Sequence, residues 1–304
     1  MTREDSGDCA VALHGVTKQF GSTIAVDHLS LEIPRGTAFG LIGPNGAGKT
    51  TIIKMLMGLL PPDAGRSSVL GIDPLADPVA VKLRVGYVPE EQCIYRWMRV
   101  GEAVGFCSSF YDTWNAQRCA ELLDQFELDA NKKVKHLSKG MRAKLSLLLA
   151  IAHEPEVLIL DEPMGGLDPI ARDEFLDGVL RALCDRQHTI LFCSHMLSDV
   201  QRLADTIGII CEGQLLVHDS TDSLLEGTKR IRAVLGSSGR SVEPPAGTIW
   251  QRVHDREWLI TVRDYSPEIL DRLRRSRAVE QVEVFSVGLE DIFKDYVRGR
   301  RAGA

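Results

Sequence analysis

The sequence predicts an α/β fold built on a parallel sheet, followed by a small C-terminal α+β domain. Residues 38–59 have the pattern of a buried strand, a glycine-rich loop and a helix. Two further apolar strands, 157–160 and 189–193, flank a helical stretch at 169–186. Because a strand, a crossover helix and a second strand form a parallel unit, these segments belong to one sheet. After about Asp219, loops rich in glycine and proline indicate a separate unit.

The N-terminal part is expected to supply strands and one helix. Residues 11–16 and 24–33 carry alternating or near-continuous apolar side chains, with many β-branched residues, between turn residues. This pattern is typical of strands. The helix after the glycine loop is expected over 49–59, where Gly58 and the prolines at 61 and 62 stop it.

A helical block is expected between the early and the late strands. Apolar residues recur at helical spacing over 100–128, and another helix opens behind Ser138 and extends to Ala152. Segments 207–211 and 214–217 have the pattern of a hairpin.

These elements suggest two domains. The first is predicted over 1–220, with a helical subdomain at about 90–155, and an accessory domain over 221–304. The predicted elements of the accessory domain are two strands and one helix, at 258–262, 279–284 and 267–275.

Composition excludes several classes of protein. The chain has 304 residues, of which 44% are apolar and 26% charged, as in globular rather than disordered proteins. A net charge of -6 disfavours nucleic-acid binding through overall basic charge. No apolar run approaches the roughly 20 residues of a membrane span, and residues 1–8 lack the features of a secretory signal, so we expect a cytoplasmic protein. The seven scattered cysteines form no C-x-x-C pair, which favours a reducing compartment and buried apolar roles.

The glycine-rich loop fits the pattern G-x-x-x-x-G-K-T. It consists of Gly43, Pro44, Asn45, Gly46, Ala47, Gly48, Lys49 and Thr50. Between a strand and a helix, such a loop cradles the phosphates of a nucleotide with backbone N–H groups. Lys49 is expected to reach the β- and γ-phosphates, Thr50 to ligate Mg²⁺, and Thr51 to touch the α-phosphate. The alternative is a chance glycine turn.

Two carboxylates end the apolar strand 157–160. Parallel strands place such groups at the sheet edge where the phosphates bind. Asp161 is expected to hold Mg²⁺, and Glu162 to accept a proton from the attacking water or to orient it. The alternative is a helix cap.

Ser138 and Gly140 lie at the start of the helix that precedes this strand, and they form a second possible anion site. In isolation, Ser138 is explained better as an N-cap. The order of the motifs is informative: glycine loop, Ser-x-Gly helix start, strand with Asp-Glu, then Gly-Leu-Asp at 166–168, then His195.

In this order, residues 11–217 resemble the nucleotide-binding subunits of ABC transporters. The resemblance implies a P-loop NTPase core: a mixed sheet with parallel P-loop strands, antiparallel N-terminal strands and a helical subdomain. It further implies that residues 137–141 are the signature motif, that 166–168 form the D-loop and that His195 contacts the γ-phosphate. Phe20 matches the aromatic residue that stacks on adenine. The plainer alternatives are that Phe20 belongs to the core and that His195 is a structural histidine.

The resemblance also implies a head-to-tail pair. In that arrangement the glycine loop of one subunit and the signature of the other, here Ser138 and Gly140, close over the same ATP. The partners expected are therefore a second ATPase subunit, identical or different, and an integral membrane permease at the inner face of the cell membrane. No nucleic-acid partner is expected.

The sequence departs from the family pattern at four positions. Lys139 replaces a glycine and Met141 a glutamine of the signature, Glu90 replaces the glutamine of the Q-loop, and Met164 replaces a threonine or serine. A carboxylate at Glu90 still suits Mg²⁺ or water. Lys139 either adds positive charge near the site or is solvated.

These departures, with the tail at 288–297, resemble the ABC-2 type branch, which is associated with export. Large apolar residues at 94–98 follow the Q-loop, where the family contacts its permease; the alternative is that Trp97 and Met98 are core.

Three other functions remain open at this stage. A soluble ABC ATPase acting on ribosomes or DNA carries two cassettes or a long coiled coil, whereas only about 90 residues separate Lys49 from Ser138 here. A regulatory module that hydrolyses ATP poorly is suggested by Glu90 and Met141. An importer ATPase has the same catalytic motifs.

Overall fold

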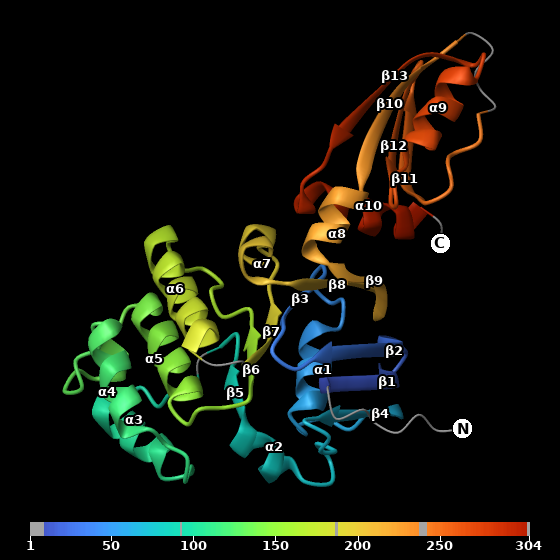
Figure 1. Ribbon diagram of the computed structural model, residues 1–304. Coiled ribbons are helices and arrows are strands. Elements are labelled where there is room, and N and C mark those ends of the chain that lie inside the picture. Colours follow the sequence, from blue (N-terminus) through green and yellow to red (C-terminus); the bar gives the residue numbers. More distant parts are fainter. Residues whose placement is uncertain (1–8, 92, 186–187, 237–241, 303–304) are drawn as a thin grey trace. The chain divides into compact units, whose positions relative to one another are not determined.

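The computed structural model describes residues 9–91, 93–185, 188–236 and 242–302 (Figure 1). The chain forms two compact units, residues 1–215 and 216–304, where the sequence suggested a division at 220. Each unit has its own hydrophobic core. In the part of the chain that is described, we find no helix with the length and apolar character needed to cross a membrane.

An antiparallel sheet begins the first unit. Strands β1 (Cys9–Phe20) and β2 (Thr23–Pro34) form a hairpin, and β4 (Ala64–Val69) pairs with the other side of β1. The antiparallel N-terminal strands expected from the resemblance are thus confirmed.

The central sheet has six strands in the order β5-β6-β7-β3-β8-β9. They are β5 (Val85–Val88), β6 (Val157–Asp161), β7 (Thr189–Cys193), β3 (Ala38–Ile42), β8 (Thr206–Cys211) and β9 (Gln214–Ser220). The first five are parallel, and every residue of β3, β6 and β7 is buried, which explains their continuous apolar sequences. The segments that follow β3, β6 and β7 therefore emerge at one edge of the sheet.

Helix α1 (Lys49–Leu56) packs between the two sheets. Its buried side chains, including Ile52 and Leu56, share one core with Leu13 of β1 and Leu191 of β7. The helix is shorter than the predicted 49–59, because the chain turns at Met57 and Gly58. In the described residues of the first unit, the remaining helices outside the helical block are α2 (Pro78–Arg84), α6 (Pro169–Asp185) and α7 (Leu197–Leu203).

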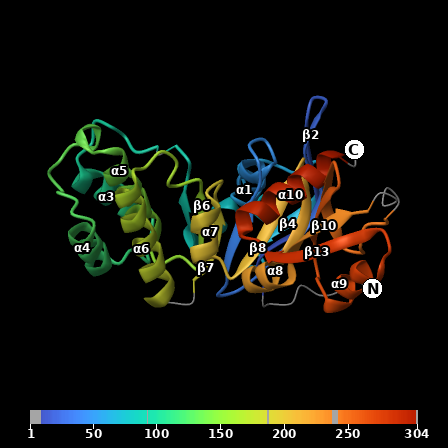
Figure 2. The same ribbon diagram turned by 90° about the horizontal axis from the view of Figure 1, so that it is seen from above.

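The helical block contains α3 (Val100–Ser108), α4 (Ala116–Gln125), the 3₁₀ turn η1 (Val134–His136) and α5 (Lys139–Ile151). With α6 these helices lie together at one end of the unit (Figures 1 and 2). The periodic stretch 100–128 contains two helices, α3 and α4. The second helix begins behind Asn115, whose N–H donates to Ala152 O and whose side chain accepts the Arg118 N–H as the N-cap of α4.

The second unit contains a four-stranded antiparallel sheet in the order β11-β12-β10-β13. Its elements are α8 (Thr221–Gly227), β10 (Lys229–Leu235), β11 (Thr248–His254), β12 (Glu257–Val262), α9 (Pro267–Arg275), β13 (Val279–Ser286) and α10 (Leu289–Ala302). The sequence predicted β12, α9 and β13 but not α8, β10, β11 or α10. Asp295 of α10 is fully buried and accepts hydrogen bonds from Arg230 and Thr261.

Candidate functional site

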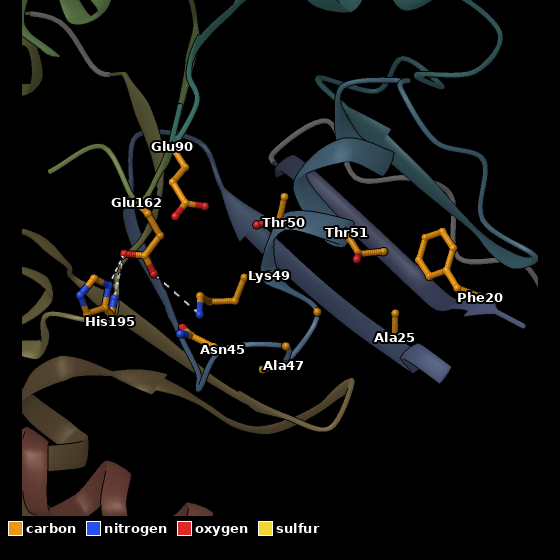
Figure 3. Close-up of a pocket in the computed structure, with 12 residues that line it drawn as sticks. Phe20, Ala25, Asn45, Ala47, Lys49, Thr50, Thr51, Glu90, Glu162 and His195 are labelled. Atoms are coloured by element: carbon orange, nitrogen blue, oxygen red, sulfur yellow. Dashed lines mark hydrogen bonds and ion pairs between the residues drawn. The ribbon is translucent and has the colours of Figure 1, made fainter. Parts of the chain in front are cut away.

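A pocket of about 740 Å³ lies beside the glycine-rich loop (Figure 3). This volume suits a ligand of nucleotide size. The pocket is lined by Phe20, Ala25, Asn45, Gly46, Ala47, Gly48, Lys49, Thr50, Thr51, Glu90, Glu162 and His195. Every lining residue except Ala25 belongs to the site predicted from the sequence.

The backbone of the loop explains why Gly48 is a glycine. Its φ is 107°, and a Cβ at this position would stand 2.3 Å from the carbonyl oxygen of Ala25. Any side chain would therefore displace the loop or strand β2. Helix α1 begins at the next residue, so the backbone N–H groups of its first turn have no partners within the helix and are available to an anion.

Lys49 is held beneath this loop and is only 7% exposed. Its Nζ donates to Gly43 O at 2.7 Å and to Pro44 O at 3.4 Å, and lies 3.8 Å from Glu162 Oε1. Gly43 and Pro44 thus contact the lysine rather than line the pocket. The ammonium group is positioned by two neutral backbone carbonyls and one carboxylate. A phosphate would bind it more strongly than the carbonyls do, because the phosphate is charged.

Asp161 is the last residue of β6 and is 1% exposed. The Thr50 hydroxyl donates to its Oδ1 at 3.5 Å. Burial raises the pKa of Asp161, and the charges of Glu90 and Glu162 add to the rise, while Thr50 and Lys49 oppose it. A buried carboxylate surrounded by like charges is stabilised by a cation.

The donor set suits Mg²⁺. Asp161, Thr50 and Glu90 offer oxygen atoms, the donors that this ion prefers. Among the residues that the structure describes, no three His, Cys, Asp or Glu side chains converge as a complete metal site. Mg²⁺ in nucleotide sites keeps several waters and uses one or two carboxylates with the phosphates, so an incomplete protein shell fits it.

Glu162 and His195 meet across adjacent strand ends. Glu162 Oε2 accepts the His195 N–H at 3.1 Å and lies 2.6 Å from His195 Nδ1. The Glu162 N–H donates to Cys193 O at 3.0 Å, which connects the segments after β6 and β7. Glu162 has a φ of 47°, unusual for a residue other than glycine and typical of strained backbone at functional sites. His195 is exposed and contacts Glu162, so it is not a core histidine.

Phe20 stands at the other end of the pocket from His195 (Figure 3). Its side chain is 50% exposed, so it is not a core residue. Ala25 lies near Phe20 and also lines the pocket, but the sequence did not predict it as a site residue. The hairpin register brings Ala25 to the loop, and no feature of the sequence around Ala25 indicates this.

Ser138 and Gly140 do not line the pocket. Ser138 is exposed, and its Oγ accepts the Met141 N–H at 3.1 Å as the N-cap of α5. Gly140 is buried against α6, where a Cβ would stand 2.7 Å from Cβ of Ala171. Lys139 is exposed, with its Nζ over Gly166.

The apolar segment after the Q-loop is divided between surface and core. Tyr95 and Trp97 are exposed, whereas Met98 is buried. The ring of Tyr95 contacts those of Trp97 and Phe106, and Phe106 contacts Phe110, all of them exposed. Met164 is buried as well.

Comparison with known proteins decides the family. The ABC transporter family matches residues 26–165. Daunorubicin resistance ATP-binding protein DrrA3 of Streptomyces coeruleorubidus is 36% identical over 240 residues, which cover 77% of this chain and 76% of that protein. This chain belongs to the ABC transporter ATP-binding proteins. This ABC ATPase is also similar to Nod factor export ATP-binding protein I of Sinorhizobium fredii, with 32% identity over 294 residues, covering 94% of this chain and 85% of that protein.

A solved structure confirms the fold of the ABC ATPase. An ATP binding subunit of an ABC transporter superposes with a TM-score of 0.65 at 27% identity, covering 70% of this chain and 90% of that one. The predictions of a P-loop α/β cassette, of ATP as ligand and of ATPase activity are therefore confirmed.

Proposed function

We propose that this ABC ATPase hydrolyses Mg²⁺-bound ATP to drive export through a separate membrane permease, working as a head-to-tail pair with a second ATPase subunit. The observation that carries the proposal is the convergence, at one sheet edge, of Lys49, the Thr50–Asp161 contact and the Glu162–His195 pair. The two relatives above are named for drug resistance and for export, which favours an exporter over an importer or a soluble ATPase.

Each group has a role that follows from its position. The loop 43–50 and the first turn of α1 bind the phosphates, with Lys49 at the β- and γ-phosphates. Glu162 accepts a proton from the attacking water or orients it, and His195, held by Glu162, donates toward the γ-phosphate. Phe20 supplies a face for the adenine ring.

Bound Mg²⁺ would neutralise charge that develops on the phosphate oxygens. Thr50 and Asp161 would hold it, with Glu90 as a further ligand or through water. Because Asp161 and Glu90 are both acidic and near each other, the ion also relieves their repulsion.

A second subunit would explain why Ser138 and Gly140 lie outside the pocket of their own chain. In this chain they open α5 outside the pocket, and Ser138 is exposed. The N-terminus of a helix attracts anions, so these residues suit the γ-phosphate of an ATP bound to the partner subunit. Lys139, at the same helix start, adds positive charge there.

The permease is expected to contact the exposed rings of Tyr95, Trp97, Phe106 and Phe110. They form a contiguous aromatic surface, a property of interaction sites. Tyr95 follows Glu90, which lines the pocket, by only a few residues. A permease bound to the aromatic surface would therefore contact a segment that is directly connected to the nucleotide site. The protein would then act at the inner face of the membrane.

Steady-state ATP hydrolysis by the purified protein tests the catalytic assignment. Glu162→Gln should lower turnover by roughly 100-fold or more while ATP still binds, because only the proton acceptor is lost. Glu226→Gln, at an exposed position of α8, is the matched control and should leave turnover unchanged. Full turnover in Glu162→Gln would refute the role of Glu162.

Purification from host membranes tests the transport assignment. An integral membrane protein should be retained with the ATPase in detergent at constant stoichiometry. Reproducible isolation as a free dimer, with no membrane protein, would refute it.

A further inference from the structure

Phe20 is supported by an ion pair that the catalytic motifs do not include. Lys18 is only 8% exposed, and its Nζ lies 2.8 Å from Asp63 Oδ1 and 5.7 Å from the centroid of the Phe20 ring. A lysine ammonium at this distance from an aromatic ring is attracted to the negative face of the ring.

Both carboxylate oxygens of Asp63 accept hydrogen bonds from residues at the end of β1. Its Oδ2 accepts the Gln19 N–H at 2.7 Å, and its own N–H donates to Thr17 O at 2.8 Å. The hydrogen bonds from Lys18 and Gln19 lower the pKa of Asp63 further below neutral, because both stabilise its ionised form. The pair thus holds both the backbone and a cation next to the residue that carries the ring.

We propose that Lys18 is a positioning residue for the base of the nucleotide: together with Asp63 it fixes the Phe20 ring in the orientation that stacks on adenine. The proposal rests on the assignment of Phe20 above. Half of the Phe20 side chain remains exposed, which leaves area for a base to cover. A ring that is already held loses less freedom on binding, so ATP binds more tightly.

The competing explanation is that Lys18 only ties β1 to the start of β4. A purely structural tie would affect every ligand of the pocket alike, because the whole hairpin, including Ala25 beside the glycine loop, would shift. A positioning role predicts an effect only on ligands that carry a base.

The experiment compares ATP with inorganic tripolyphosphate, which has the phosphates but no base. Dissociation constants for both are measured by calorimetry on the full chain carrying Lys18→Met, Lys18→Arg, Phe20→Leu, or Lys18→Met with Phe20→Leu. Lys54→Met, at an exposed position of α1, is the matched control for loss of one lysine. Thermal unfolding of each variant reports whether the fold is retained.

Lys18→Met should weaken ATP binding about three- to tenfold and leave tripolyphosphate binding within about twofold. Lys18→Arg should retain ATP binding, because a cation remains over the ring. In the Phe20→Leu background, Lys18→Met should have almost no further effect.

Equal weakening of both ligands by Lys18→Met would overturn the proposal, as would an undiminished effect in the Phe20→Leu background. An unchanged affinity for ATP in Lys18→Met would do the same. These outcomes differ from failure of the proposed function, in which the wild-type protein binds neither ligand. If Phe20→Leu itself leaves ATP binding unchanged, the role of Phe20 fails, and that of Lys18 with it.

Discussion

Replacement of Gly48 by alanine tests whether the conformation of the phosphate loop requires glycine. Gly48 has a φ of 107°, and a Cβ would lie 2.3 Å from the carbonyl oxygen of Ala25 and 3.4 Å from a side-chain carbon of Val26. The first contact is well inside van der Waals distance. It also involves backbone, which cannot rotate away as a side chain can.

Two effects add to the cost of this substitution. A non-glycine residue in such a backbone conformation costs of order 1–3 kcal/mol. Insertion of an atom into a packed site costs typically about 1–3 kcal/mol more. We therefore expect Gly48→Ala to lower the free energy of unfolding by roughly 2–6 kcal/mol, or to displace the loop and lose phosphate binding.

Denaturant unfolding and ATP binding are measured together. Gly71→Ala is the matched control: Gly71 also has a positive φ, 77°, but a Cβ there would meet no atom within 4 Å. It should show only the backbone part of the cost and bind ATP normally. If Gly48→Ala binds ATP as the wild type does and unfolds at the same denaturant concentration as Gly71→Ala, the steric argument is wrong.

Two further predictions concern buried charge. His153 is 1% exposed and burial lowers its pKa to about 4, so an unfolded chain takes up a proton at that site below its ordinary pKa of 6.5 and the folded chain does not. The free energy of unfolding should therefore fall by about 2 kcal/mol between pH 7 and pH 5 from this group alone. Denaturant unfolding at the two pH values should show a smaller fall in His153→Phe, and an equal fall would refute the assignment. In the second unit, Arg230→Met leaves the fully buried Asp295 without its closest cation and should lower the free energy of unfolding by about 3–5 kcal/mol. The matched Arg232→Met removes exposed ion pairs with Glu257 and Glu283 and should change the midpoint of the same unfolding curve little; similar losses in both variants would contradict this account.

The sequence by itself determined the cassette and most of its pocket. The glycine loop consists of consecutive residues between a strand and a helix, so its pattern can be recognised from the sequence alone. The same holds for Asp161 and Glu162, because a buried parallel strand has a continuous apolar sequence and a fixed carboxyl end. In the second unit, alternation was weaker: β11 is largely exposed, so little hydrophobic pattern marks it, and it was missed.

Only the tertiary structure decided which of these groups touch. The 2.6 Å contact of Glu162 with His195 depends on β6 and β7 being neighbours, and the contact of Thr50 with Asp161 depends on α1 facing β6. Strand order and helix packing follow from burial summed over the whole core, which no local segment encodes. For the same reason, the sequence did not predict that Ala25 lines the pocket, or that Ser138 lies outside the pocket of the chain to which it belongs.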